Sequence, residues 1–285
     1  GLLRSAQAEH PGRFVLVDSD GTDRSERALD AALATGEPEV ALRAGRITVP
    51  RLHETPVTET APDPATPSWN TEGTVLVTGG TGGVGAHLAR HLVTRHGIRH
   101  LLLTSRRGPE APGVAPLVAE LEAAVTVEAC DMADRDAVAR LLDAIPGDRP
   151  LTGIVHAAGV IDDGLVRDLT PERLATVLRP KADAAWHLHQ LTADLDLTAF
   201  VLFSSTAALV DGPAQGNYAA ANLFLDALAA HRHRHGLPAT SVAWGLWTGT
   251  GGMEDLLDET SLQRIRRQGF RPLTAAEGLA LLDAS

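Results

Sequence analysis

Four side chains in the second half of the chain have the chemistry needed to reduce a carbonyl group. Tyr218 and Asn222 lie four residues apart in a stretch with a helical pattern, so both project from one face of the helix. Ser205 ends an expected strand 13 residues before Tyr218, and Lys181 belongs to the helix before that strand. A tyrosine can protonate a carbonyl oxygen as hydride reaches the carbon, if a nearby ammonium group lowers the pKa of the phenol. A serine hydroxyl can hold the same oxygen, and an asparagine can fix a backbone group or a water molecule in the relay.

The composition leaves few competitors for these roles. The 285 residues include one tyrosine, and 24 of the 25 basic side chains are arginines, so Lys181 is the one lysine. Taken singly, each residue also has a plain structural interpretation, since Ser205 could cap a turn and Lys181 could be a surface lysine beside Pro180. Their occurrence together, in this order and after the turn described next, favours the catalytic interpretation.

A glycine-rich turn earlier in the chain could hold a dinucleotide. An apolar strand at 74–77 leads into Thr78-Gly79-Gly80-Thr81-Gly82-Gly83-Val84-Gly85, and a helix follows. Glycines let the backbone approach a pyrophosphate, whose charge is stabilised by the helix N-terminus. The spacing is G-x-x-x-G-x-G, which differs from the commonest fingerprint, and a purely structural tight turn is the alternative. The residues expected to contact the cofactor here are Gly79, Gly80, Thr81, Gly82, Gly83, Val84 and Gly85.

The end of the second strand indicates which cofactor is bound. Ser105, Arg106 and Arg107 stand where NAD-binding proteins usually carry an acid that bonds the ribose, and guanidinium groups suit a 2′-phosphate instead. This favours NADP(H) over a solvated pair of charges in a loop. After the third strand, Asp131 and Met132 are placed to bond and cover an adenine, although Asp131 could equally cap the next helix.

Regular alternation of strands and helices predicts the fold. The expected strands cover 74–77, 100–104, 125–129, 151–155, 200–203 and 239–244, and the expected helices cover 84–94, 116–123, 135–145, 171–191, 217–235 and 274–282. Continuous apolar strands between helices are typical of a parallel sheet covered on both faces, the doubly wound α/β (Rossmann) architecture. One more strand is expected after the last helix, so both ends resemble cuts through a longer polypeptide.

The chain is expected to have three parts. Residues 54–72 contain four prolines and no sustained apolar period, and are interpreted as a linker. Residues 1–53 hold an expected strand at 14–17, a helix at 25–34 capped near Asp23, and a hairpin at 40–49. Such a segment is too short to be comfortable as a lone domain, so it is interpreted as part of something larger. Residues 73–285 form the expected nucleotide-binding part.

Charge and composition exclude several function classes. The formal net charge of −11 argues against a nucleic-acid partner, and a single cysteine, Cys130, excludes an internal disulfide. No apolar run suggests a membrane span or a signal peptide, so a soluble, cytoplasmic protein is expected. Metal binding is not expected, because His187 and His189 point in different directions on a helix. The histidines of 231–235 stand at a helix end, where cations offset the dipole.

Taken together, these motifs resemble the short-chain dehydrogenase/reductase superfamily, and specifically the ketoreductase domain of modular polyketide synthases. The matching stretches, within about 73–285, are TGGTGGVG, SRRG, Asp131-Met132, His156-Ala157-Ala158-Gly159, Arg179-Pro180-Lys181, Phe203-Ser204-Ser205, Tyr218-Ala219-Ala220-Ala221-Asn222 and Ala243-Trp244-Gly245-Leu246-Trp247. Ordinary short-chain reductases carry the lysine four residues after the tyrosine and the asparagine in the preceding helix. Here the two are exchanged, as in polyketide and animal fatty acid synthase ketoreductases.

The resemblance implies roles, cofactor and partners. Tyr218 would be the proton donor, Ser205 the carbonyl anchor, and Lys181 and Asn222 the supporting pair. The cofactor would be NADPH, and the substrate a 3-ketoacyl thioester on an acyl carrier protein. Residues 1–53 resemble the closing part of the structural subdomain that precedes such catalytic domains, so its remainder and neighbouring synthase domains are further partners. The alternatives are a standalone dehydrogenase acting on a free alcohol or ketone, and a redox-inactive scaffold or epimerase.

The same resemblance extends to stereochemical markers. Ile161-Asp162-Asp163 is similar to the Leu-Asp-Asp motif of B-type domains, although Asp162-Asp163-Gly164 is also simply a good turn. Position 210 is a valine and not the tryptophan that marks A-type domains. Ala220 is not a proline and Gln215 is not a histidine, which disfavours an epimerising subtype. A D-configured 3-hydroxyl product is implied. The residues assigned to the substrate and its stereochemistry are Ile161, Asp162, Asp163, Pro213, Gln215, Asn217 and Trp247.

Residues 249–271 combine glycines with an amphipathic stretch. A lid that closes over cofactor and substrate is one interpretation, and a surface helix is the other.

Overall fold

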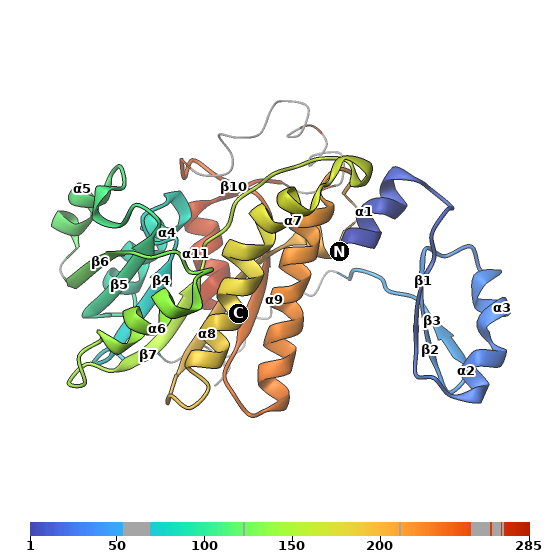
Figure 1. Ribbon diagram of the computed structural model, residues 1–285, viewed down its shortest axis with the longest axis horizontal. Helices are drawn as coiled ribbons and strands as arrows, with labels where there is room; N and C mark the ends of the chain where they lie inside the picture. The colour runs from blue at the N-terminus through green and yellow to red at the C-terminus, as the bar shows by residue number, and fades with distance from the viewer. Residues whose placement is uncertain (54–68, 122, 211, 252–262, 264–268, 270) are drawn as a thin grey trace.

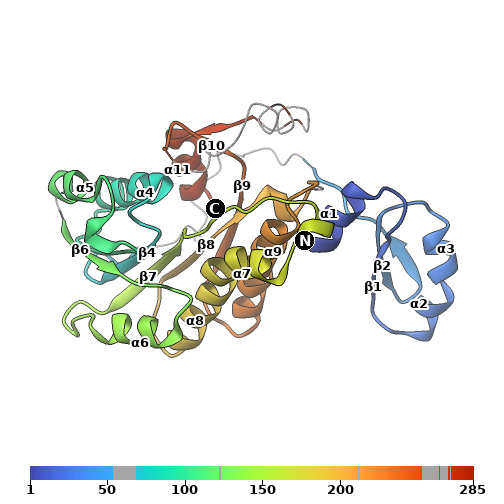
Figure 2. The same ribbon diagram turned by 45° about the horizontal axis from the view of Figure 1, so that its top comes forward.

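The computed structural model describes residues 1–53, 69–121, 123–210, 212–251, 263, 269 and 271–285. Most of the expected linker and most of the expected lid therefore lie outside the described residues. A large α/β unit and a small N-terminal unit stand side by side, and helix α1 lies between them (Figures 1 and 2). Among the described residues, no helix is both long enough and apolar enough to cross a membrane.

A six-stranded, all-parallel sheet forms the centre of the large unit. Its order is β6-β5-β4-β7-β8-β9, which confirms the predicted doubly wound architecture. The order reverses at β4, so the connections that follow β4 and β7 lead to helices on opposite faces of the sheet and leave a crevice between them. The strands are β4 (Thr74–Thr78), β5 (His100–Ser105), β6 (Ala124–Ala129), β7 (Leu151–His156), β8 (Ala199–Ser205) and β9 (Thr240–Trp244).

Helices cover both faces of this sheet. Because successive side chains of a strand point to opposite faces, Val75 and Val77 of β4 join one core while Leu76 joins the other. The first core also takes in α4, α5 and α11, and the second takes in α6, α8 and α9. The α-helices that the structure describes in this unit are α4 (Gly83–Thr94), α5 (Val114–Glu120), α6 (Arg135–Asp143), α7 (Pro171–Leu178), α8 (Ala184–Leu191), α9 (Gly216–Arg234) and α11 (Ala275–Asp283).

The expected long helix at 171–191 is interrupted. Residues Arg179–Asp183 form a π-helix between α7 and α8. Pro180 lacks an N–H and cannot make the ordinary helical hydrogen bond, which accounts for a wider turn at this point. The prediction of one continuous helix was therefore wrong in its middle, at the turn that carries Lys181. After β9, the short strands β10 (Trp247–Thr248) and β11 (Leu273–Thr274) pair in parallel.

The N-terminal unit is a three-stranded sheet with two short helices. Its strands are β1 (Leu16–Ser19), β2 (Glu39–Arg43) and β3 (Arg46–Thr48), and its helices are α2 (Asp23–Arg27) and α3 (Leu29–Leu33). The β2–β3 hairpin is confirmed, whereas the first strand begins two residues later than expected. The expected single helix is two, and the Thr22 side chain caps the first.

Helix α1 (Leu2–Glu9) attaches this unit to the large one. Arg4 pairs with Glu39 of the small sheet and donates to the carbonyl of Ala208, 2.6 Å away. The carboxylate of Glu9 accepts from the amides of Val166 and Ala214, at 2.9 and 3.0 Å. These contacts fix two loops of the large unit that border the site described next.

Candidate active site

A cavity of about 640 Å³ opens at the carboxyl ends of the parallel strands. This is the edge at which doubly wound sheets bind their ligands. Residues from the ends of β4, β5, β7, β8 and β9 and from α9 line it, so it runs across the crevice where the strand order reverses.

The glycine turn between β4 and α4 forms one end of the cavity. Gly79 has φ of +68°, and a Cβ there would stand 3.0 Å from Ala158. A Cβ on Gly85 would collide with the carbonyl oxygen of Gly79. Helix α4 begins without a side-chain cap on its first amides, which leaves donors for an anion. The glycine turn therefore forms a backbone cradle with no room for side chains. Such a cradle fits the pyrophosphate of a dinucleotide.

Two arginines border the cavity at the end of β5. Arg106 and Arg107 are exposed, and neither forms a salt bridge within the described part of the chain. The hydroxyl of Ser105 accepts a hydrogen bond from the amide of Gly108 at 3.0 Å, which holds this turn. The arrangement suits a phosphate on the adenosine ribose.

The neighbouring pair Asp131 and Met132 also lines the cavity. Met132 is buried, whereas the Asp131 carboxylate accepts from the amide of Ala133 at 3.0 Å. Asp134, not Asp131, caps α6, through bonds from the amides of Asp136 and Ala137. The alternative that Asp131 caps the next helix, which the sequence left open, is therefore wrong.

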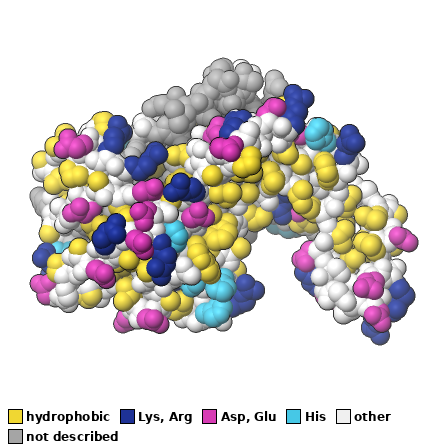
Figure 3. Space-filling model, viewed as in Figure 1, with side chains coloured by type: hydrophobic (Ala, Val, Ile, Leu, Met, Phe, Trp, Pro, Cys, Tyr) yellow, Lys and Arg dark blue, Asp and Glu magenta, His cyan; other side chains and the backbone are white. Residues whose placement is uncertain are grey.

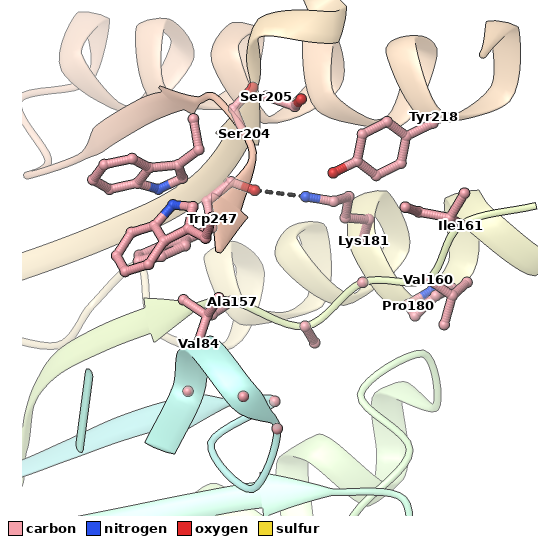
Figure 4. A pocket seen from close by; sticks show the side chains of 18 of the residues that line it. Val84, Ala157, Val160, Ile161, Pro180, Lys181, Ser204, Ser205, Tyr218 and Trp247 are labelled. Carbon is pink, nitrogen blue, oxygen red and sulfur yellow. Dashed lines mark hydrogen bonds between the residues drawn. The ribbon is translucent and has the colours of Figure 1, made fainter. Parts of the chain in front are cut away.

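The proposed catalytic residues meet at the other end of the cavity. Tyr218, Ser205 and Lys181 all line it, and Figure 4 shows the Tyr218 hydroxyl on the same side as Ser205 and the Lys181 amine. The Lys181 nitrogen donates to the carbonyl of Phe203 at 2.5 Å and lies 5.6 Å from the centroid of the Tyr218 ring. Three segments distant in sequence thus place a hydroxyl, a phenol and an amine around one small volume.

The electrostatics of this group differ from the expectation that an ammonium lowers the tyrosine pKa. Burial raises the pKa of Tyr218, and hydrogen bonding to Ser205 and Asn222 only partly opposes this. Burial also lowers the pKa of Lys181 to about 7, so near neutral pH its charge is partly lost. Tyr218 therefore keeps its proton at neutral pH, which is the form that a proton donor needs.

Asn222 lies behind the cavity and does not line it. Its side-chain nitrogen donates to the carbonyl of Tyr218 at 2.8 Å, and its own carbonyl accepts from Ser204 at 3.2 Å. Asn222 is fully buried and ties α9 to β8. Its part in the relay stays a prediction.

A buried histidine links the two ends of the site. The Nδ1 atom of His156 lies 2.7 Å from the Thr78 hydroxyl, and Nε2 lies 3.0 Å from the Lys181 carbonyl. Thr78 in turn accepts from the amide of Ala158. Burial, with a further contribution from Lys181, lowers the pKa of His156 to about 3, so the ring is uncharged at neutral pH.

This histidine makes the folded state sensitive to acid. An unfolded chain binds a proton at His156 below its ordinary pKa of 6.5, whereas the folded chain does so only near 3. The stability that the neutral His156 contributes is therefore fully present above pH 6.5. Between pH 6.5 and about 3, the free energy of unfolding falls by about 1.4 kcal/mol for each unit by which the pH falls. We expect His156→Gln to lose this slope in urea unfolding between pH 6.5 and 4.

The control for this prediction is His187→Gln, which removes a partly buried histidine outside the network. It should retain the wild-type slope. Equal slopes in wild type and His156→Gln would contradict the prediction.

Several residues that the resemblance assigns to stereochemistry lie in a loop that is held by hydrogen bonds beside Tyr218. The guanidinium of Arg173 holds both carboxylate oxygens of Asp162, with a nearest contact of 2.7 Å, and lowers its pKa. Asn217 donates to the carbonyl of Asp162 at 2.8 Å, and Gln215 donates to the carboxylate of Asp163 at 3.1 Å. These acids position the loop and do not themselves line the cavity.

The cavity brings together most of the residues named from the sequence. Those that line it are Gly79, Thr81, Gly82, Gly83, Val84, Gly85, Ser105, Arg106, Arg107, Asp131, Met132, Ala157, Ala158, Gly159, Ile161, Lys181, Ser205, Gln215, Tyr218 and Trp247. Those that do not are Gly80, Asp162, Asp163, Pro213, Asn217 and Asn222. Gly80 instead packs against Leu103, which a Cβ would approach to 2.9 Å.

Several contributors were missed in the sequence. Phe203 and Trp244 were not assigned to the site, yet they line the cavity beside Trp247, which was assigned to it, and the two indoles lie 5.0 Å apart between centroids. Their positions at strand ends were the available signal. Thr250, at the start of the expected lid, lines the cavity, and its carbonyl faces Gly83. The roles of Arg173 and of Glu9 in α1 depend on contacts across the fold, which no local pattern marks.

Known proteins share this arrangement. The family model of the KR domain matches residues 73–249, and that of the Polyketide synthase extender module SpnB, Rossmann fold domain, matches residues 1–52. The chain therefore belongs to the KR family, the ketoreductase domains of polyketide synthases, which are oxidoreductases.

Individual relatives agree with this. The chain is 54% identical over 287 residues to Polyketide synthase GfsA of Streptomyces halstedii, covering 100% of this chain but 4% of the relative. It is 58% identical over 221 residues to Mycoketide-CoA synthase of Mycobacterium tuberculosis, covering 76% of this chain and 5% of the relative. The chain thus corresponds to a small part of these long proteins.

Solved structures are similar over the whole chain. A structure described as an A-type ketoreductase from a modular polyketide synthase has a TM-score of 0.89 and 45% identity, covering 99% of this chain and 60% of that one. The first ketoreductase of the tylosin polyketide synthase has a TM-score of 0.86 and 42% identity, with coverages of 99% and 61%.

Proposed function

We propose that the chain reduces a 3-ketoacyl thioester, carried on an acyl carrier protein, to the 3-hydroxyacyl thioester with NADPH. The observation that carries this proposal is the convergence of Ser205, Lys181 and Tyr218 at one end of a cavity whose other end is a glycine cradle. A keto group placed between them would meet a hydroxyl anchor and a protonated phenol, and the glycine cradle would hold the cofactor at the other end of the cavity.

The proposed mechanism divides the work among these residues. Bound NADPH would supply the hydride for the ketone carbon. The hydroxyl of Ser205 donates a hydrogen bond to the ketone oxygen and so holds it in place. Tyr218 transfers its phenolic proton to the same oxygen as negative charge develops there. Lys181, with its pKa of about 7, lies close enough to stabilise the phenolate that remains. Asn222 and His156 hold the backbone around Tyr218 and Lys181 in place.

The choice of NADPH rests on charge. Arg106 and Arg107 bring two guanidinium groups to the end of β5, and Ser105 adds a hydroxyl. A 2′-phosphate would accept charge-assisted hydrogen bonds from these groups, whereas the ribose of NADH carries no anion for them to bind.

The proposed organisation follows the family. Residues 1–53 would be the closing part of a structural subdomain, 54–72 a linker, and 73–285 the catalytic subdomain of a cytoplasmic synthase. Large apolar side chains of the N-terminal unit are exposed, among them Phe14, Val15 and Leu33 at 40–46%. Apolar side chains also gather on the face of this unit seen in Figure 3. The remainder of the structural subdomain is the partner that we propose to cover them.

A D-configured product is proposed from local residues. The similarity to an A-type structure extends over the entire fold, so the distinction between types must depend on individual side chains. Ile161 lines the cavity within the loop braced by Arg173 and Asn217, and Val210 stands where A-type domains carry tryptophan. Chiral chromatography of the hydrolysed product should give the D alcohol, and an L alcohol would refute this assignment.

One comparison of substrates tests the proposed activity. NADPH oxidation should be fast with a 3-ketoacyl thioester on a carrier protein, slower with a small-molecule thioester, and slowest with a simple ketone. Preference for the simple ketone would favour a standalone dehydrogenase. Cofactor binding without oxidation of NADPH would favour a redox-inactive scaffold or epimerase.

A further inference from the structure

Two histidines and an aspartate converge at the end of the molecule opposite the glycine turn. His91 lies in the last turn of α4, His96 follows that helix, and Asp283 is the last residue of α11. The Nε2 atom of each histidine lies 2.8 Å from the same oxygen, Oδ1 of Asp283. The three potential ligand atoms all lie within 4.8 Å of one another. Two histidine nitrogens thus meet one carboxylate oxygen that lies 192 and 187 residues further along the chain.

The geometry is close to that of a bound metal ion. Zinc takes imidazole nitrogen and carboxylate oxygen at about 2.0–2.2 Å, so ligand atoms of a tetrahedral site stand about 3.3 Å apart. Opening the two 2.8 Å contacts by about half an ångström would admit an ion. The imidazole rings are nearly perpendicular, at 76°, and do not stack, so both nitrogens can face the same point.

The electrostatics at this place favour a cation. Both α4 and α11 end here, and the carbonyl ends of helices carry partial negative charge. One carboxylate oxygen and two imidazole nitrogens are ligand types that zinc takes in proteins.

The surroundings distinguish this cluster from the catalytic site. The side chains of His91, His96 and Asp283 are 14%, 19% and 26% exposed, which leaves room for a water molecule as fourth ligand. None of the three lines the catalytic cavity. The ring of His96 contacts Trp69, with centroids 6.1 Å apart, and Trp69 packs over Gly153 of β7. An ion here would link α4, the loop after it and α11, beside the segment around Trp69 that enters the large unit.

We propose that His91, His96 and Asp283 bind a divalent transition-metal ion of the zinc type, in a structural site that fastens α11 to α4. The site is independent of the proposed reductase activity. It holds no substrate, and its ion takes no part in hydride or proton transfer.

Binding by the full chain tests this proposal. Metal-free protein should take up one equivalent of Zn²⁺ in competition with a chromophoric chelator, and Co²⁺ should give the visible absorption of a tetrahedral site. Zn²⁺ should also raise the unfolding temperature, and EDTA should reverse the rise. His96→Gln and Asp283→Asn should each weaken binding by at least about tenfold, because loss of even an outer partner of a ligand costs 10–100-fold.

Two controls complete the experiment. His87→Gln removes a histidine one turn earlier on α4 that lies outside the cluster, and it should bind Zn²⁺ as the wild type does. Tryptophan fluorescence would establish that each variant is folded. Absence of uptake by the wild type would overturn the proposal and leave a hydrogen-bonded cluster. Undiminished binding by both His96→Gln and Asp283→Asn would overturn it as well.

Discussion

Tyr218→Phe is expected to lower kcat for reduction of a 3-ketoacyl thioester by about 10²–10⁴-fold, the contribution typical of a positioned proton donor. The chain has one tyrosine, so no second phenol can substitute. The change removes one oxygen atom and keeps the ring that packs against Val177 and Ala221, so the fold should be preserved. Steady-state oxidation of NADPH measures the effect.

Cofactor binding separates a chemical effect from a structural one. Fluorescence titration with NADPH should give nearly the same dissociation constant for wild type and Tyr218→Phe, because the glycine turn lies at the other end of the cavity. Ser205→Ala should reduce kcat less, because it removes an anchor and leaves the donor. Near-wild-type turnover by Tyr218→Phe would show that another group donates the proton.

The double variant Arg106→Ala, Arg107→Ala should lose the preference for NADPH. Each guanidinium is expected to give a charge-assisted hydrogen bond to the 2′-phosphate, and loss of both from an exposed site should raise KM for NADPH by roughly 10–100-fold. The constants with NADH should change little, because NADH carries no phosphate there. The ratio of kcat/KM for the two cofactors is the quantity to measure.

Arg135→Ala is the matched control for this experiment. Arg135 is exposed at the start of α6 and does not line the cavity. Its removal changes the net charge in the same direction without removing a proposed phosphate ligand. Equal losses with NADPH and NADH in the double variant would mean that the arginines support the fold and not the phosphate.

Much of the fold could be predicted because its signals are local. Each strand of the parallel sheet is a short apolar run followed by glycine or a polar turn, and the structure confirms all six within about two residues. The glycine turn and the Tyr218–Asn222 spacing are likewise local. The carboxyl ends of parallel strands meet at one edge of the sheet, which explains why Ser205 and the glycine turn line one cavity.

The remaining features depend on contacts across the fold. The π-helix around Lys181 contains Pro180, and the carbonyl of Lys181 accepts a hydrogen bond from Nε2 of the buried His156, which comes from a distant strand. The raised pKa of Tyr218 follows from burial, which composition does not reveal. The attachment of α1 through Glu9 to loops more than 150 residues away leaves no mark in the local sequence. His91 and His96 drew no attention because their partner, Asp283, is distant in the chain.

Transfer of deuterium from labelled cofactor tests the central claim most directly. The chain would be incubated with NADPH deuterated at C4 of the nicotinamide and a 3-ketoacyl thioester, and the product examined by mass spectrometry. The account predicts a 3-hydroxyacyl thioester with one deuterium, bonded to C3, which the Tyr218→Phe variant should form about 10²–10⁴-fold more slowly under the same conditions. Unreduced 3-ketoacyl thioester from the folded, NADPH-bound wild type, or a reduced product without deuterium at C3, would contradict it.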